Sequence, residues 1–136
     1  MIFLDASVLL AAEDTDDVQH QASAALLATG ALATIDLAAY EVVNVAERRW
    51  RDPAASARLR QRLWAIAELG VLVRADAELT ERTAELARAH QLSAYDAAYV
   101  AAARRLSLPL ASCDQRDLVA RGLAQLPSAL VDQRSR

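Results

Sequence analysis

Short runs of apolar residues alternate along the chain with longer stretches that have helical periodicity. The short runs occupy residues 2–5, 32–36, 71–74 and 108–112, with a weaker run at 129–131. The helical stretches occupy residues 5–12, 16–29, 37–51, 54–68, 78–90, 93–105 and 114–121. This alternation predicts an α/β fold with a central, mainly parallel sheet of about five strands.

The stretch SAYDAAYVAAA, at the start of the helix 93–105, places one carboxylate in an apolar helix. The helix is apolar on nearly all sides until Arg104 and Arg105, which predicts that it is buried. Ser93 and Asp96 have the spacing of a capping box, so helix capping explains Asp96 locally. A buried ionised carboxylate is nevertheless costly unless it is hydrogen-bonded, paired or bound to a metal.

Three more carboxylates stand near the starts of helices. Asp5 and Asp114 follow apolar strands, and Glu41 lies one turn into the helix 37–51. Taken alone, Asp5 and Asp114 are explained as helix caps, and Glu41 as part of a solvated face with Asn44 and Arg48. Together with Asp96 they form a different pattern, because ligands bind at the carboxyl edge of parallel sheets. Clustered carboxylates favour a hard divalent cation such as Mg²⁺ or Mn²⁺.

Composition limits the class of protein. The 136 residues fit one domain, which we place at 1–132 and follow with a short tail at 133–136. The net charge of −3 argues against nucleic-acid binding by bulk positive charge, although bound cations would change the local balance. The single cysteine, the interrupted apolar run at the N-terminus and the lack of a membrane-spanning run predict a cytoplasmic protein with no membrane contact.

Three segments carry a resemblance to a known family. They are MIFLDASVLLA, AAYEVVNVAERR and LSAYDAAYVAAARRLSLPLASCDQRDL, and they hold the four acids in the order Asp5, Glu41, Asp96, Asp114. In these segments the sequence resembles the PIN-domain ribonucleases, and within them the VapC-like toxins of type II toxin–antitoxin pairs. The resemblance covers nearly the whole chain and implies a PIN-like three-layer α/β/α fold.

The resemblance also implies a function. It predicts an Mg²⁺- or Mn²⁺-dependent endoribonuclease that cleaves RNA phosphodiester bonds with metal-activated water, acts as a toxin, is held inactive by a cognate antitoxin and forms a homodimer. Asp5, Asp96 and Asp114 match the metal-binding aspartates, and Glu41 matches the fourth catalytic acid. Four further residues are candidates for accessory roles: Ser7, Ser112 (where threonine is more usual), Arg116 and Asp117.

Other functions remain open on the sequence alone. In a non-catalytic PIN-like module that binds a protein partner, the acids would only cap helices. A phosphotransferase would use Asp5 as a covalent nucleophile, but the chain has no lysine and no Asp-x-Asp after the first strand. A cysteine hydrolase would need a base such as His20 or His90 beside Cys113, which sits on an apolar strand as a small core residue would.

Overall fold

Four short strands form one parallel sheet in the computed structural model, which describes residues 1–136. The strand order is β3-β2-β1-β4, and every neighbouring pair is parallel. The strands are β1 (Ile2–Leu4), β2 (Leu32–Ile35), β3 (Val71–Val73) and β4 (Leu110–Ala111). The residues of β1 and β2 are all buried, as expected for strands covered on both faces.

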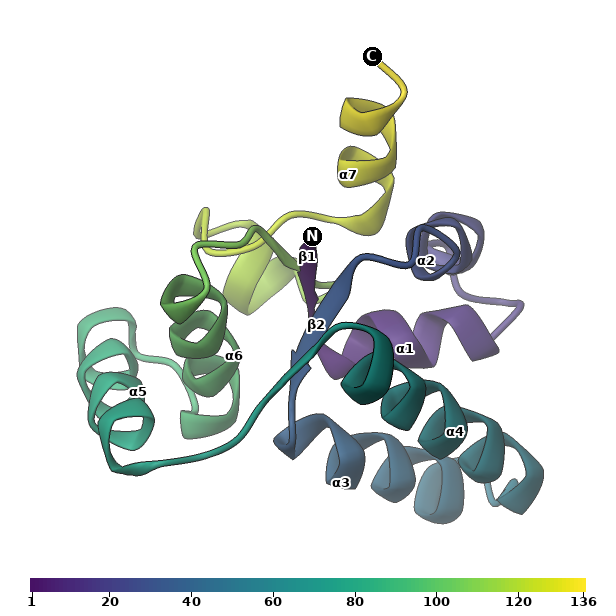
Figure 1. Ribbon diagram of the computed structural model, residues 1–136, viewed down its shortest axis with the longest axis horizontal. Helices are drawn as coiled ribbons and strands as arrows, with labels where there is room; N and C mark the ends of the chain where they lie inside the picture. Colours follow the sequence, from purple (N-terminus) through teal and green to yellow (C-terminus); the bar gives the residue numbers. More distant parts are fainter.

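Helices connect the strands and cover both faces of the sheet. Figure 1 shows α5 and α6 on one side of β1 and β2, and α1, α3 and α4 on the other, which confirms the three-layer arrangement. The helices are α1 (Ala6–Glu13), α2 (His20–Leu27), α3 (Leu37–Asn44), α4 (Pro53–Leu69), α5 (Ala77–His90), α6 (Ala94–Arg105) and α7 (Pro127–Arg134), with π-helical turns η1 (Val45–Arg49) and η2 (Gln115–Val119). None of them combines the length and the apolarity that crossing a membrane requires.

The predicted strand at 129–131 is wrong, because these residues lie inside α7. Pro127 occupies the start of α7, where its fixed φ favours a helix and its missing N–H costs nothing. The fifth position of the sheet is instead a single parallel bridge between Ala111 and Gln125. Helix α7 ends at Arg134, two residues into the segment predicted to be a tail.

The strand register brings distant parts of the chain together at the carboxyl edge of the sheet. Leu4 of β1 pairs with Ala111 of β4, so the residues that follow them, Asp5 and Ser112, are neighbours. On the other side of β1, the Thr34 hydroxyl of β2 donates a 2.8 Å hydrogen bond to the Leu4 carbonyl oxygen. The end of β1 is therefore fixed from both neighbouring strands.

Helix α6 is buried, as its composition predicts. Ala97 and the run from Tyr99 to Ala103 are buried, whereas Arg104 and Arg105 are exposed. Because α6 packs on the sheet over β2 and β4, its first turn stands next to the edge where β1 and β4 end.

Candidate active site

Asp5 lies at the centre of the acidic edge and is bound by two serine hydroxyls. It is 6% exposed and is the N-cap of α1. Its Oδ2 accepts a 2.6 Å hydrogen bond from the Ser112 hydroxyl and a 3.1 Å bond from the Ser7 hydroxyl. Burial raises the pKa of Asp5, the two hydroxyls counteract that rise, and the negative charge of Asp114 adds to it.

The two serines attach Asp5 to the segment that follows β4. The Ser112 hydroxyl accepts a 3.0 Å hydrogen bond from the Asp114 amide, and the Ser7 hydroxyl accepts a 2.9 Å bond from the Cys113 amide. Each hydroxyl has one proton, so accepting from an amide leaves that proton for Asp5. The backbone at 113–114 therefore sets the direction in which both serines donate.

Asp114 caps the next turn and also faces the other acids. Its Oδ1 accepts a 3.0 Å hydrogen bond from the Asp117 amide at the start of η2. The helix-cap interpretation is thus correct for Asp5 and for Asp114, but a cap uses only part of a carboxylate. The remaining oxygen of Asp114 is available to a ligand.

Asp96 meets Asp114 and Asp117 in the tightest group of acids. One carboxylate oxygen from each of the three lies within 4.8 Å of the others. The Ser93 hydroxyl accepts a 3.1 Å bond from the Asp96 amide, so capping is satisfied through the backbone of Asp96. Burial, followed by the charges of Asp114, Asp5 and Asp117, raises the pKa of Asp96 to about 6. Asp117, which the sequence predicts only as an accessory residue, is therefore part of this group.

Glu41 reaches the same edge from α3. It is not part of a solvated face: its Oε1 is buried and has no hydrogen-bond partner, whereas Asn44 and Arg48 of the same helical side are exposed. Burial, followed by the negative charge of Asp5, raises the pKa of Glu41 to about 7. Glu41 is therefore close enough to Asp5 and Asp96 for their charges to act on it, and its role as the fourth catalytic acid remains a prediction.

Tyr99 is a site neighbour that the sequence analysis does not identify. It is 1% exposed, and its hydroxyl, like Glu41 Oε1, has no hydrogen-bond partner. Burial and the charges of Asp5 and Glu41 raise its pKa far above the usual range, so the phenol keeps its proton. The signal that identifies it is spacing, because a residue three positions after Asp96 lies on the same helical face.

The donor set fits a hard divalent cation. The group contains only carboxylate oxygens and no histidine nitrogen or cysteine sulfur, which matches Mg²⁺ or Mn²⁺ rather than zinc. Glu41 Oε1 is a buried acceptor without a donor, and a cation would satisfy it. The pKa values of Asp96 and Glu41 are raised first by burial and then by neighbouring carboxylates, and a bound cation would oppose both effects.

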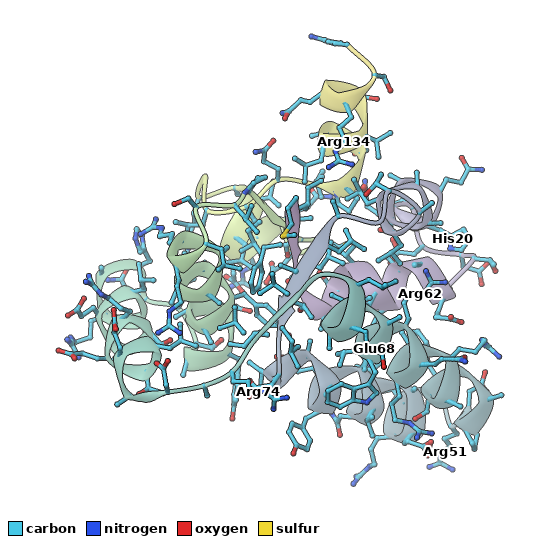
Figure 2. The ribbon with its side chains drawn as sticks, viewed as in Figure 1. His20, Arg51, Arg62, Glu68, Arg74 and Arg134 are labelled. Carbon is cyan, nitrogen blue, oxygen red and sulfur yellow. The ribbon has the colours of Figure 1, made fainter.

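Positive charge is spread over the surface. The labelled arginines lie in different parts of the chain around the outside of the molecule: Arg62 in α4, Arg134 in α7, and Arg51 and Arg74 in connecting segments (Figure 2). Arg116 is exposed in η2, two residues after Asp114, and is in no ion pair. Its accessory role remains a prediction.

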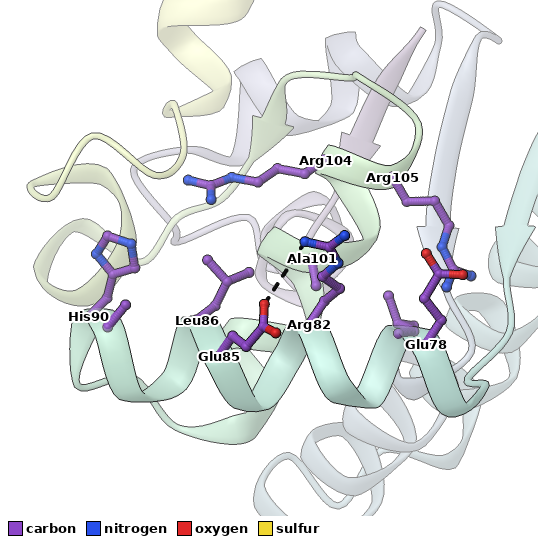
Figure 3. Close-up of a pocket in the computed structure, with 10 residues that line it drawn as sticks. Glu78, Arg82, Glu85, Leu86, His90, Ala101, Arg104 and Arg105 are labelled. Atoms are coloured by element: carbon purple, nitrogen blue, oxygen red, sulfur yellow. Dashed lines mark ion pairs between the residues drawn. The ribbon is translucent and has the colours of Figure 1, made fainter.

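The arrangement disfavours a cysteine hydrolase. Burial raises the pKa of the Cys113 thiol to about 11, which suppresses the thiolate that such chemistry needs. His20 donates from Nδ1 to the Ala11 carbonyl oxygen at 2.9 Å. His90 lines a cavity of about 600 Å³ between α5 and α6, which is lined by none of the four predicted acids (Figure 3).

The comparisons with known proteins point to one family. Residues 2–121 match the PIN domain family. The chain is 31% identical over 119 residues to Ribonuclease VapC3 of Pyrobaculum aerophilum, which covers 85% of this chain and 90% of that protein.

Two solved structures share the fold. One is a toxin–antitoxin complex from Klebsiella pneumoniae, with a TM-score of 0.70, 16% identity, and coverage of 93% of this chain and 98% of that chain. The other is Mycobacterium tuberculosis VapC20, described as a sarcin–ricin loop cleaving toxin, with a TM-score of 0.66, 25% identity, and coverage of 79% and 85%.

Proposed function

The chain belongs to the PIN-domain family, in its VapC-like branch, and from this premise we propose that it is an Mg²⁺- or Mn²⁺-dependent endoribonuclease that acts as the toxin of a toxin–antitoxin pair. The observation that carries the proposal is the group Asp96, Asp114 and Asp117, whose oxygens lie within 4.8 Å of one another. Glu41 and Asp5 stand beside this group. Four elements of the fold deliver these acids to one edge of the sheet.

Some of the acids would bind the cation directly, and others would act through water or by holding their neighbours in place. Asp96, Asp114 and Asp117 would supply the nearest oxygens, and Glu41 would contribute directly or through water. Asp5 would be the least free to move, because Ser7 and Ser112 both donate to its Oδ2. A bound Mg²⁺ or Mn²⁺ would lower the pKa of water to provide the nucleophile and would neutralise charge on the scissile phosphate.

The protein's own part of the mechanism is to hold this site in place before substrate arrives. The serines keep Asp5 oriented, and the caps Ser93 and Asp114 fix the starts of α6 and η2. Rigid carboxylates cost little to organise when the phosphate binds, which is how preorganised sites accelerate a reaction. No covalent nucleophile is required, and the burial of Asp5 makes it a poor one.

The proposed partners are an RNA substrate and a cognate antitoxin protein. The antitoxin is supported by the likeness in fold to a chain of the Klebsiella pneumoniae toxin–antitoxin complex. We further propose a homodimer. Trp64 and Leu69 of α4 are 47% and 82% exposed, and such side chains are commonly covered in an assembly.

Asp96→Asn tests the metal mechanism. We expect this variant to lose RNA cleavage by at least about 100-fold, because a neutral amide replaces a charged ligand, while its circular dichroism stays that of the wild type. The assay uses total cellular RNA with Mg²⁺ or Mn²⁺, and EDTA should abolish cleavage by the wild type. Asp132→Asn, an exposed aspartate of α7, is the matched control and should cleave normally.

Two results would overturn this proposal. Full activity of Asp96→Asn would remove the metal site from the mechanism, and so would wild-type activity that survives EDTA. If calorimetry shows no Mn²⁺ binding at millimolar metal and no RNA is cleaved, the chain is instead a PIN-like module that binds a protein partner.

A further inference from the structure

Two buried polar atoms without partners lie next to each other between α3 and α6. They are the Tyr99 hydroxyl and Oε1 of Glu41, and neither has a hydrogen-bond partner of normal geometry. The two groups are close enough that each affects the other's pKa. A buried polar atom without a partner is unfavourable, so native proteins rarely retain one without a use.

The Tyr99 hydroxyl does not support the fold through any hydrogen bond. Phenylalanine would fill the same volume on α6 without adding a polar atom to the core. The hydroxyl is therefore best explained by the groups that it faces, which are the Asp5 and Glu41 carboxylates and the backbone at Ala6.

Of these two carboxylates, only Glu41 has a buried oxygen that accepts no hydrogen bond. Asp5 Oδ2 already accepts from Ser7 and Ser112, and Asp5 Oδ1 faces the Ser7 amide at 3.5 Å. Glu41 Oε1 accepts nothing. A tyrosine phenol carries its proton at neutral pH and is therefore a donor, and an ionised carboxylate is a strong acceptor for it.

We propose that Tyr99 is a positioning residue: its hydroxyl donates to Oε1 of Glu41 and holds that carboxylate turned toward Asp5 and Asp96, where it takes part in binding the cation. The inference rests on the proposed function, since it gives Glu41 its orientation within the same site. With a cation bound at the site, Glu41 would be ionised and would accept this bond from the Tyr99 hydroxyl. Tyr99 itself touches neither the cation nor the RNA.

Tyr99→Phe tests the proposal, with Mn²⁺ affinity measured by calorimetry on the full chain. We expect the dissociation constant for Mn²⁺ to rise about tenfold, as it does when a group that orients a metal ligand is lost. The melting temperature without metal should stay the same or rise, because the change removes a buried hydroxyl without a partner. Cleavage should recover when Mn²⁺ is raised in proportion to the lost affinity.

Tyr95→Phe is the matched control. It removes the same oxygen from the same helix, but Tyr95 is 64% exposed, so we expect no change in Mn²⁺ affinity. A second arm places Tyr99→Phe in a Glu41→Ala background, which removes the acceptor of the proposed hydrogen bond. If Tyr99 acts through Glu41, the tyrosine change should have no further effect there, so the two single effects should not add.

Three results would overturn the inference. They are an unchanged Mn²⁺ affinity in Tyr99→Phe, a lower melting temperature without metal, and a tenfold loss of affinity that persists in the Glu41→Ala background. Measurements on the wild type show whether only the role of Tyr99 is wrong or the proposed function as well. If the wild type binds Mn²⁺ and cleaves RNA while Tyr99→Phe matches it, only the role of Tyr99 is wrong.

Discussion

Two aspartates near the starts of neighbouring helices have opposite electrostatics. Asp76 is the N-cap of α5, is exposed, and receives two hydrogen bonds from Arg105 at 2.9 and 3.0 Å, which lower its pKa to about 2. Asp96 lies in the first turn of α6, is half-buried, and has only other carboxylates as charged neighbours, so its pKa rises to about 6. The same residue type serves as a satisfied surface charge in one helix and as an unsatisfied one in the next.

The difference distinguishes a cluster of paired charges from a cluster dominated by carboxylates. Around the α5–α6 cavity the charges alternate in sign, and Arg82 and Glu85 approach to 3.9 Å (Figure 3). At the acidic edge the carboxylates outnumber their counter-charges: Arg121 approaches Asp117 to 3.9 Å, whereas Asp96 and Glu41 have no cation beside them and are partly shielded from water. A fold retains such a cluster at a cost to its own stability, which is typical of sites that bind a cation.

Ser112→Ala should have the largest effect among changes that leave every acid in place. It removes the 2.6 Å hydrogen bond to Asp5 and the acceptor of the Asp114 amide, so both acids lose their fixed orientation. We expect RNA cleavage to fall by about 10–100-fold. Ser135→Ala, an exposed serine after α7, is the control, and equal activity of the two variants would show that the acidic edge needs no such support.

The stability of the metal-free protein should decrease as pH rises. The pKa values of about 7 for Glu41 and about 6 for Asp96 lie above their ordinary values of 4.5 and 3.8, so between those limits the folded chain holds protons that the unfolded chain has released. The free energy of unfolding therefore falls as pH rises from about 4 to about 7 and then levels off. After a discount for partial exposure to solvent, we expect the two groups to lower it by about 1–2 kcal/mol.

Thermal melts in EDTA between about pH 5 and pH 8 measure this loss as a decrease of about 2–8 °C. Saturating Mn²⁺ should remove the decrease, because the cation replaces the missing counter-charge. In Glu41→Gln the slope should be smaller. If the metal-free melting temperature stays constant or rises over this pH range, the pKa values of Glu41 and Asp96 are not raised. Asp96 would then not differ from Asp76 in the way described above.

Asp76→Asn should have the smallest effect. Asparagine still caps α5 by accepting from the Leu79 amide, as Asp76 does at 2.8 Å, and only the charge opposite Arg105 is lost. Exposed ion pairs contribute little, so we expect no measurable change in melting temperature or in RNA cleavage. A marked loss of activity would mean that the α5–α6 side is coupled to the acidic edge.

Much of the fold and of the site could be predicted from local signals. The apolar runs identified β1, β2, β3 and β4, because continuous apolar segments are typical of strands buried on both faces. The same signal failed at 129–131, where three apolar residues are equally compatible with a helix and Pro127 decides for the helix. The sequence also predicted helix capping at Ser93, Asp5 and Asp114, and the structure confirms all three caps.

The sequence by itself determined which acids stand at the starts of helices, since that depends only on short-range periodicity and caps. Only the tertiary structure decided which of them meet. Asp117 joins Asp96 because η2 turns beside α6, and Ser112 reaches Asp5 because Leu4 pairs with Ala111 across the sheet. Burial is also a tertiary property, so no local pattern could show that Tyr99 and Glu41 face each other without partners.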